Sequence, residues 1–358
     1  MHVLHVVGAR PNFMKAAPLL RALASESATR QTLVHTGQHY DASMSDQFFE
    51  QLEMPAPDYN LGVGSGTHAR QTAAVMLALE PVLLQTVPDL ALVYGDVNST
   101  VAAALVCSKL GLRIAHVEAG LRSRDRTMPE EINRILTDQL SDVLFTPSED
   151  ANQNLSLEGI GESRIHFVGN VMIDTLIRLL PCAEKNFRPQ STHPYALVTL
   201  HRPSNVDDPA WLRDLIETLT ELSTDLNVVF PVHPRTRQRL HALGATKQNS
   251  ERLQFLDPLP YLQFLALQRY ASVVITDSGG IQEETTFLRV SCITVRENTE
   301  RPITITQGTN QLVGRDLSRL QTAVREVLAK KDAGELQRKP IPLWDGHAAE
   351  RIAKVILS

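Results

Sequence analysis

The feature that most constrains this chain is a repeated alternation of short apolar runs with longer amphipathic stretches. In the first half, the apolar runs have the length and composition of buried strands, and helical patterns such as residues 68–85 and 100–110 separate them. This βαβα rhythm predicts an α/β fold with a doubly wound parallel sheet. The predicted strands are residues 3–7, 31–36, 90–94, 113–117, 143–146 and 165–168.

A second series of the same kind follows a polar segment at residues 185–194. We therefore expect two Rossmann-like domains, residues 1–168 and 169–346, facing a central cleft. The amphipathic pattern near the end predicts a helix, and we expect residues 347–358 to pack back on the first domain. The strands predicted in the second series are residues 196–200, 227–231, 253–256, 272–276 and 291–295.

Composition excludes several classes of function. A length of 358 residues favours two domains, and contents of 43% hydrophobic and 21% charged residues are typical of a globular protein. A net charge of −5 argues against nucleic acid as a partner, and no apolar run approaches the length of a membrane span. The chain starts on a strand pattern without a basic leader, so we expect a cytoplasmic location.

No motif indicates a metal or a cofactor. Cys107, Cys182 and Cys292 lie too far apart for a zinc spacing or a disulfide framework, and Cys107 and Cys292 fall in helix-like and strand-like runs. We expect neither a metal nor a redox cofactor. The glycine-rich residues 62–66 do not follow a predicted strand, so we expect a loop there and not a dinucleotide fingerprint.

The densest group of chemically capable residues lies between His116 and Arg134. It carries Glu118 at a strand end and Glu130 and Glu131 in the first turn of a predicted helix, amid several arginines. An acidic first turn is favoured by the helix dipole alone, which accounts for at least one of the two neighbouring glutamates. Arginines can bind an anionic substrate while a carboxylate moves a proton, so the segment suggests chemistry on a phosphorylated molecule.

Two further strand ends in the first half carry candidates. Arg10 stands at a helix start marked by Pro11, with Lys15 one turn further along, and together they form a possible anion pocket. Asp96 follows another strand, and Asn98 to Thr100 are expected to cap the next helix. A surface location for the cations and a simple turn for Asp96 are the alternatives.

In the second half, His201 and Arg202 end a predicted strand, and His233 is a weaker case of the same kind. The turn with Ser278, Gly279 and Gly280 joins a strand to a helix, where backbone N–H groups can approach a phosphate. Glu284 lies on the helix that follows, where its carboxylate can accept hydrogen bonds from the two hydroxyls of a ribose. Arg301 is a further partner for an anion.

The motifs at these positions resemble those of the non-hydrolysing UDP-N-acetylglucosamine 2-epimerases, from one end of the chain to the other. They are Gly-Ala-Arg-Pro-Asn-Phe-Met-Lys (8–15), Thr-Gly-Gln-His-Tyr-Asp (36–41), Tyr-Gly-Asp-Val-Asn-Ser-Thr (94–100), His-Val-Glu-Ala-Gly-Leu-Arg (116–122), Pro-Glu-Glu-Ile-Asn-Arg (129–134), Val-Gly-Asn-Val-Met-Ile-Asp-Thr (168–175), Thr-Leu-His-Arg-Pro (199–203), Thr-Asp-Ser-Gly-Gly-Ile-Gln-Glu-Glu (276–284) and Arg-Glu-Asn-Thr-Glu-Arg-Pro (296–302).

The resemblance implies a GT-B-like fold, a homodimer, and interconversion of UDP-N-acetylglucosamine and UDP-N-acetylmannosamine. It implies a catalytic group of Asp96, Glu118, Glu130 and His201. It also implies that Phe264 lies near the uracil, and that UDP contacts come from Arg10, Lys15, Ser278, Gly279, Gly280, Glu284 and Arg301.

The chain departs from the family pattern after His201-Arg202, where the family commonly has x-Glu-Asn and this chain has Pro203-Ser204-Asn205. This departure bears on which sugar of a UDP-sugar substrate the chain prefers. The version of the 36–41 loop found here, with Gln38-His39-Tyr40, also differs from the Gln-His-Arg version used for activation by substrate in some members.

The chemistry expected is loss of UDP from C1 of the sugar, which makes the C2 hydrogen acidic, followed by re-addition. Three alternatives remain. One is a 2-epimerase of a modified sugar such as UDP-2,3-diacetamido-glucuronate, although the pattern at residues 171–174 favours the simpler sugar. The others are a GT-B glycosyltransferase, which would need an acceptor, and a nucleotide-sugar sensor without activity.

Overall fold

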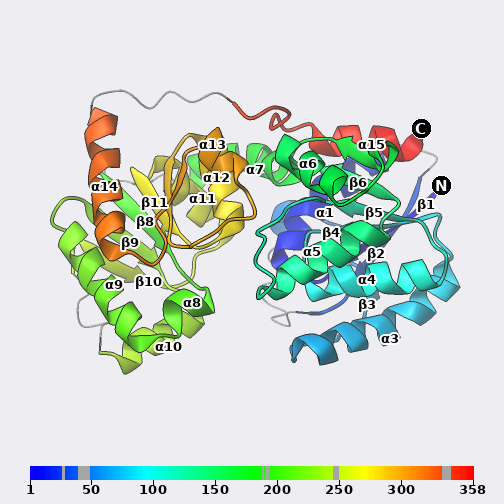
Figure 1. Cartoon of the computed structure of the whole chain (residues 1–358), viewed down its shortest axis with the longest axis horizontal. Coiled ribbons are helices and arrows are strands. Elements are labelled where there is room, and N and C mark those ends of the chain that lie inside the picture. Colours follow the sequence, from blue (N-terminus) through cyan, green and yellow to red (C-terminus); the bar gives the residue numbers. More distant parts are fainter. Residues whose placement is uncertain (26–28, 39–48, 188, 190–192, 245–249, 333–339) are drawn as a thin grey trace. The chain divides into compact units, whose positions relative to one another are not determined.

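The computed structural model describes residues 1–25, 29–38, 49–187, 189, 193–244, 250–332 and 340–358 of the chain, which forms two compact units (Figure 1). Unit 1 comprises Met1–Thr175 and Pro342–Ser358, and unit 2 comprises Leu176–Ile341. Among the described residues, no helix is both long enough and apolar enough to cross a bilayer.

Unit 1 is built on a parallel sheet with the strand order β3-β2-β1-β4-β5-β6-β7. Its strands are β1 (His2–Val7), β2 (Arg30–His35), β3 (Tyr59–Asn60), β4 (Leu90–Tyr94), β5 (Ile114–Val117), β6 (Val143–Thr146) and β7 (Ile165–Phe167). Its helices are α1 (Arg10–Ala24), α3 (His68–Thr86), α4 (Asn98–Lys109), α5 (Pro129–Leu140), α6 (Glu149–Leu157), the short η1 (Glu162–Arg164), the start of α7 (Val171–Phe187), and α15 (Ala348–Leu357).

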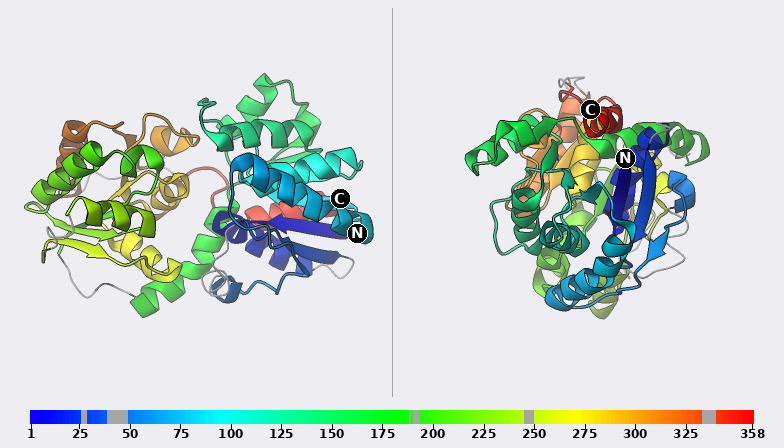
Figure 2. Two further views of the ribbon diagram at one scale, coloured as in Figure 1. Left: turned by 90° about the horizontal axis from the view of Figure 1, so that it is seen from below. Right: turned by 90° about the vertical axis from the view of Figure 1, so that its right-hand side faces the viewer.

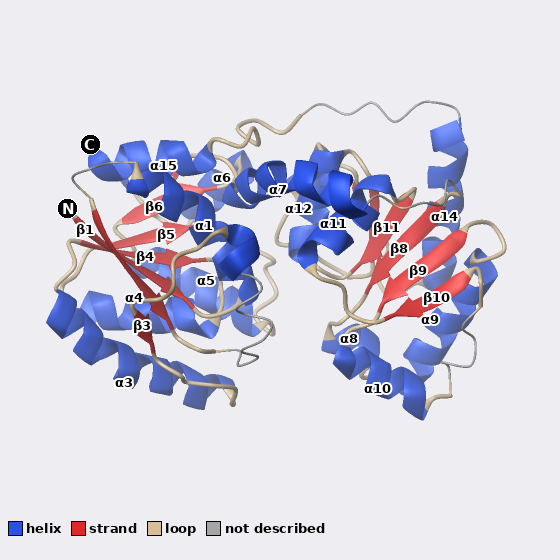
Figure 3. Ribbon diagram, turned by 180° about the vertical axis from the view of Figure 1, so that it is seen from behind, coloured by secondary structure: helices blue, strands red, loops and turns tan. Residues whose placement is uncertain are grey.

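Unit 2 repeats this plan with the order β10-β9-β8-β11-β12-β13, again parallel. Helices lie on both faces of its sheet (Figure 3). Its strands are β8 (Tyr195–Thr199), β9 (Asn227–Pro231), β10 (Leu253–Leu256), β11 (Val273–Thr276), β12 (Ser291–Thr294) and β13 (Asn310–Leu312). Its helices are the rest of α7, α8 (Pro203–Val206), α9 (Pro209–Leu222), α10 (Pro234–Ala242), α11 (Tyr261–Tyr270), α12 (Gly279–Leu288), α13 (Ile303–Thr306) and α14 (Leu317–Asp332).

The central strands are almost wholly buried, because helices cover both faces of each sheet. All five residues of β4 and all four of β11 are buried. Such strands read as continuous apolar runs in the sequence, which is why they could be predicted. In each sheet the strand order reverses at one point, between β1 and β4 in unit 1 and between β8 and β11 in unit 2. The loops that follow these strands are the preferred place for a ligand.

The C-terminal helix belongs to unit 1, where α15 packs against α1 and both chain ends lie close together (Figure 2). The carboxylate of Asp174 accepts hydrogen bonds from the N–H groups of Ala348 at 3.2 Å and Ala349 at 2.7 Å, at the start of α15. Burial raises the pKa of Asp174 to about 6, against these hydrogen bonds, which lower it. The indole N–H of Trp344 donates to the carbonyl of Pro147 at 2.9 Å.

The structure confirms the predicted α/β class with two doubly wound parallel sheets, and each predicted strand is present within a residue or two at its ends. Cys107 and Cys292 are buried in α4 and β12, as expected. Two short edge strands, β3 and β13, were not predicted. Residues 39–41 of the 36–41 motif, and part of the segment 185–194, lie outside the described residues.

Two local predictions were wrong. The cap of α4 is Val97, which offers no side-chain hydrogen bond, and Asn98 to Thr100 form the first turn instead. The hydroxyl of Thr100 donates to the carbonyl of Tyr94 at 2.8 Å, so it ties the helix to the strand before it. The glycine-rich residues 62–66 form a loop, but they do follow a strand, because β3 ends at Asn60.

Two glycines with the same backbone conformation provide a test of packing in unit 1. Gly120 and Gly159 both have φ of +81°, but a Cβ on Gly120 would lie 2.5 Å from the carbonyl oxygen of Ala151, whereas a Cβ on Gly159 meets nothing within 4 Å. Gly159→Ala should cost on the order of 1 kcal/mol, from conformation alone. Gly120→Ala should cost roughly 1–3 kcal/mol more, because the backbone of α6 must move.

Denaturant unfolding of both variants measures the difference. Equal midpoints for Gly120→Ala and Gly159→Ala would contradict the close packing of the Gly120 turn against α6.

Candidate functional site

The loops at the switch point of unit 1 are held together by Asn12, in the first turn of α1. Its Oδ1 accepts from the backbone N–H of Gly8 at 3.0 Å and of Ala9 at 3.2 Å, and its Nδ2 donates to the carbonyl of Tyr94 at 2.7 Å. The turn after β1 is therefore fixed to the end of β4. A Cβ on Gly8 would lie 2.3 Å from the Ser99 hydroxyl oxygen, so only glycine allows this approach to α4.

Lys15 and Glu118 form a buried ion pair at this switch point. Their side chains are 5% and 3% exposed. Glu118 has φ of +75°, a conformation that a non-glycine residue rarely adopts outside strained sites. A Cβ on Gly95 would lie 2.7 Å from the Lys15 ammonium nitrogen, so this glycine leaves room for the cation. The sequence suggested that Lys15 binds an anionic ligand. In the structure Lys15 is paired with the carboxylate of Glu118.

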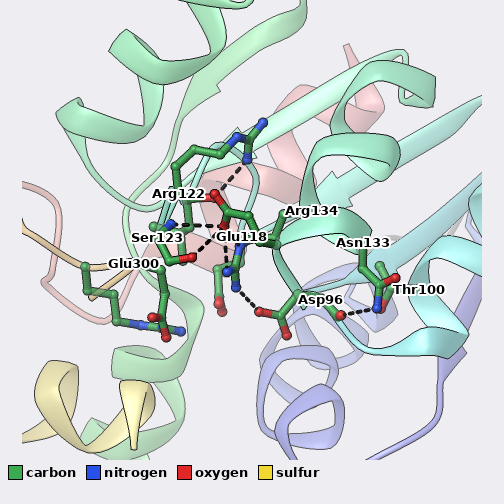
Figure 4. Close-up of polar contacts among 12 residues, drawn as sticks. Asp96, Thr100, Glu118, Arg122, Ser123, Asn133, Arg134 and Glu300 are labelled. Carbon is green, nitrogen blue, oxygen red and sulfur yellow. Dashed lines mark hydrogen bonds and ion pairs between the residues drawn. The ribbon is translucent and has the colours of Figure 1, made fainter. Parts of the chain in front are cut away.

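Arg134 joins two more carboxylates of unit 1. Its guanidinium forms ion pairs with Asp96 and with Glu131, and the neighbouring Asn133 donates to the backbone carbonyl of Asp96 at 2.8 Å (Figure 4). The Asp96 side chain remains 24% exposed, whereas Arg134 is 2% exposed. Helix α5 therefore fixes both the backbone and the side chain of Asp96 while leaving the carboxylate accessible.

The structure separates the two adjacent glutamates of α5. Glu131 is buried and accepts from the Ser123 N–H at 3.0 Å, the Arg124 N–H at 2.8 Å and the Arg134 guanidinium at 2.7 Å. Burial alone would raise the pKa of Glu131, but the hydrogen bonds from Ser123 and Arg134 outweigh burial and the pKa lies below its ordinary value. Glu130 is exposed. Of these two glutamates, it is Glu131 that pairs with Arg134.

Arg10 occupies the first position of α1 and is exposed. Among the residues predicted in the first half, the structure thus pairs Lys15 with Glu118. It also pairs Asp96 with Arg134 of α5.

In unit 2, the switch point is organised by Asp277, which directly follows β11. Its carboxylate is fully buried and accepts from the backbone N–H of His201 at 3.0 Å and of Arg202 at 2.9 Å, and from Asn205 Nδ2 at 3.1 Å. It also lies 3.0 Å from Nδ1 of the His201 ring, which is 47% exposed. Burial would raise the pKa of Asp277, but the hydrogen bond and charge of His201 outweigh it and the net shift is downward.

The predicted phosphate turn is present as the start of α12. Ser278 is the residue before the helix, and Gly279 and Gly280 form its first turn. A Cβ on Gly279 would lie 2.3 Å from Arg301 Nη1 and 2.4 Å from Glu300 Oε1, so glycine is required for this contact. The helix N-terminus presents backbone N–H groups, as an anion site requires.

Arg301 is buried among carboxylates. Its Nε lies 2.9 Å from Glu283, its Nη1 pairs with Glu300, and Glu300 also receives Arg296 Nη2 at 2.7 Å. The two arginines outweigh burial and hold the pKa of Glu300 well below its usual range. Arg301 therefore fixes the loop behind Gly279.

Of the remaining predicted residues of unit 2, Phe264 and Glu284 lie on α11 and α12, and His233 directly precedes α10. Glu284 is buried and accepts from the Tyr261 hydroxyl at 3.0 Å, which fixes its rotamer. Phe264 is half-buried on α11. The ring of His233 is tilted by 42° relative to that of His201, with centroids 6.5 Å apart.

Sequence reasoning missed the groups that hold the candidates in place. Asp277 was noted only as the start of a glycine-rich motif, and neither Asp138 nor Asn12 was singled out. No local signal identifies them, because their partners lie far away in the chain. In the described part of the chain, no group of three or more His, Cys, Asp or Glu side chains is arranged to hold a metal ion.

Two doubly wound α/β units, each with charged residues at its switch point, are the architecture of many nucleotide-binding enzymes. The family model for UDP-N-acetylglucosamine 2-epimerase matches residues 21–357, and the chain belongs to this family.

Individual relatives match over nearly the whole length. The UDP-N-acetylglucosamine 2-epimerase of Methanocaldococcus jannaschii is 42% identical, over 98% of this chain and 97% of the relative. The UDP-2,3-diacetamido-2,3-dideoxy-D-glucuronate 2-epimerase of Pseudomonas aeruginosa is also 42% identical, over 99% of each chain. The crystal structure of the M. jannaschii enzyme in complex with UDP-GlcNAc and UDP superimposes with a TM-score of 0.91, covering 100% of this chain and 99% of that one.

The contrast between Glu130 and Glu131 gives a prediction about stability. Glu131→Gln should destabilise the chain by about 3 kcal/mol at neutral pH, because it leaves Arg134 under-compensated in a buried setting. Because folding lowers the pKa of Glu131, its contribution is complete above about pH 4.5 and is lost as the pH falls through the lowered value. Glu130→Gln should change stability by less than about 0.5 kcal/mol.

Thermal unfolding of both variants between pH 3 and pH 7 measures this. A Glu131→Gln deficit that does not shrink on acidification would show that the charge of Glu131 is not what stabilises the fold.

Proposed function

We propose that the chain catalyses the reversible epimerisation at C2 of UDP-N-acetylglucosamine to UDP-N-acetylmannosamine. The observation that carries the proposal is the pairing of Asp96 with Arg134 and of Glu118 with Lys15 at the switch point of unit 1, in a member of this family. Two carboxylates held by cations at the ends of adjacent strands suit proton transfer, and the M. jannaschii structure contains UDP-GlcNAc and UDP.

In this proposal, unit 2 supplies most contacts to the nucleotide. The N–H groups of Ser278, Gly279 and Gly280 and the nearby Arg301 face the diphosphate, and Arg10 and Lys15 of unit 1 add positive charge. Glu284 binds the ribose hydroxyls, with its rotamer set by Tyr261, and Phe264 lies against the uracil. Preorganised positive charge stabilises the departing diphosphate, and such charge is often the largest catalytic contribution.

The C2 hydrogen of the sugar is not acidic in the ground state, because no carbonyl carbon adjoins C2. When the bond from C1 to the UDP oxygen breaks, its electron pair leaves with UDP and positive charge develops at C1. Asp96 or Glu118 then removes the C2 proton, and a C1–C2 double bond forms, giving 2-acetamidoglucal and UDP. Glu130 or His201 delivers a proton to the opposite face of C2 as the UDP oxygen adds back to C1.

Asp277 prepares His201 for this proton transfer. The carboxylate of Asp277 contacts Nδ1 of His201, so Nε2 is the nitrogen that exchanges a proton with the substrate.

A second candidate is epimerisation of UDP-2,3-diacetamido-glucuronate, at the same carbon. It is favoured by the 42% identity to the P. aeruginosa enzyme and by Ser204, which stands where the family commonly has glutamate. A turn without that negative charge, next to Arg202, is more compatible with a sugar that itself carries a carboxylate.

A single assay tests the reaction and the choice of sugar. Incubated with UDP-N-acetylglucosamine in D2O, the protein should form UDP-N-acetylmannosamine with one deuterium at C2, since the proton removed exchanges with solvent, and NMR and mass spectrometry detect it. The diacetamido-glucuronate should turn over more slowly; the reverse order would favour the second candidate. Product without deuterium at C2 would rule out this route.

The role of Asp96 has its own test. Asp96→Asn should lower turnover by roughly 10²–10⁴-fold, because the amide cannot accept the C2 proton, while UDP affinity measured by calorimetry stays near that of the unmodified protein. Asp89, at the opposite end of β4, accepts from the His2 N–H at 2.6 Å, so Asp89→Asn is the matched control and should retain turnover. Full activity in Asp96→Asn would remove this residue from the scheme.

A further inference from the structure

The turn after β5 carries Glu118 in a conformation that its own sequence does not favour. Glu118 has φ of +75°, and Gly120, two residues on, has φ of +81°. The N–H groups of Glu118 and Ala119 both donate to the carbonyl of Phe145, at 3.1 Å and 3.0 Å. A non-glycine residue stays in this region only where its surroundings over-determine the backbone.

Asp138, a fully buried residue of α5, forms several of the contacts that hold this turn. Its Oδ2 accepts from the Gly120 N–H at 3.1 Å and lies 2.7 Å from Arg122 Nη1. Its Oδ1 lies 2.6 Å from Nδ1 of His116, which is also fully buried. One carboxylate therefore holds the residues on both sides of Glu118.

His116 extends this arrangement to the neighbouring strand. Its Nε2 lies 2.8 Å from the carbonyl oxygen of Gly95, the residue before Asp96. A carbonyl can only accept, so Nε2 must carry a hydrogen. Asp138 lies beside Arg122 and its pKa is lowered, so its carboxylate accepts from Nδ1 as well. Both ring nitrogens of His116 therefore donate, Nδ1 to Asp138 and Nε2 to Gly95.

The charges in this group compensate one another. Arg122 Nε and Nη2 lie 2.8 Å and 2.6 Å from the carboxylate of Glu158, so Arg122 lies between two carboxylates, those of Glu158 and Asp138. Burial would raise the pKa of Asp138, but His116 and Arg122 outweigh it and the pKa is lowered. Buried ions require such compensation, and with it they hold their partners in a defined geometry.

We propose that Asp138 is a positioning residue that holds the turn carrying Glu118 through Gly120 and Arg122, and the turn carrying Asp96 through His116. We call Asp138, His116, Gly120 and Arg122 the Asp138 brace. The inference rests on the proposed function, because Glu118 and Asp96 are there the groups that transfer protons. Asp138 itself does not contact the substrate, so it acts on rate through the placement of the two carboxylates.

The kinetic test uses Asp138→Asn, which keeps the shape of the side chain and removes its charge. Turnover should fall about 100-fold, the effect of misplacing reacting groups by about 1 Å, whereas KM and UDP affinity should stay close to those of the unmodified protein. A loss shared equally by turnover, UDP affinity and thermal stability would instead show a general structural role and overturn the proposal. Unchanged turnover in a folded variant would overturn it too.

Asp142→Asn is the matched control. Asp142 accepts from the Ile114 N–H at 2.8 Å at the opposite end of β5, so it anchors the same strand away from Glu118. This variant should keep its turnover even if it is less stable. A 100-fold loss of turnover in Asp142→Asn as well would mean that any loosening of β5 is sufficient, and that Asp138 has no particular role.

Nitrogen-15 NMR of the histidine rings tests the brace without reference to activity or to the folding of Asp138→Asn. In the unmodified protein, the His116 ring, assigned by its absence from His116→Gln, should show hydrogen on both nitrogens. A ring with one unprotonated nitrogen would overturn the brace even if Asp138→Asn fails to fold. If the brace is seen and no UDP-sugar is epimerised, the proposed function fails separately.

Discussion

The interaction on which the candidate site depends is the compensation of charge in a buried environment. Removing an ion from water costs several kcal/mol, so a buried carboxylate persists only beside a cation or several donors. At the switch point of unit 1, Lys15 compensates Glu118, and Arg134 compensates both Glu131 and Asp96. These pairings fix side chains that would otherwise move freely. The residues that pack the carboxyl ends of these strands are therefore the same residues that form the candidate site.

The fold could be predicted from the sequence to the extent that burial leaves a local pattern. Strands covered on both faces are continuous apolar runs, and β4 and β11 are examples. The edge strand β13 leaves no such pattern, because Asn310–Leu312 begins with two polar residues. Asn310 is held instead by hydrogen bonds to Thr294 at 2.6 Å and to Gln282 at 3.0 Å. A strand defined by distant partners cannot be found from its own residues.

The same limit applies to the candidate site. Position at a strand end and residue type were sufficient to select Asp96, Glu118 and His201. They could not separate Glu130 from Glu131, because a helix dipole favours acid at either position. Only the fold shows that the oxygens of Glu131 are taken by Ser123, Arg124 and Arg134. The sequence likewise gives no sign that Arg301, which we propose acts on the diphosphate, is itself held in place by Glu283 and Glu300.

Each unit places a buried aspartate where it binds a histidine and a backbone N–H of the adjacent turn. Asp138 does this with His116 and Gly120, and Asp277 with His201 and Arg202. The difference between the two pairs lies in the histidine. His116 is fully buried and both of its nitrogens are engaged in hydrogen bonds within unit 1, so its ring has no contact with solvent. The His201 ring is 47% exposed and is engaged at Nδ1, so Nε2 can exchange a proton. In our proposals, the same pair of residue types thus holds a turn in place in unit 1 and transfers a proton in unit 2.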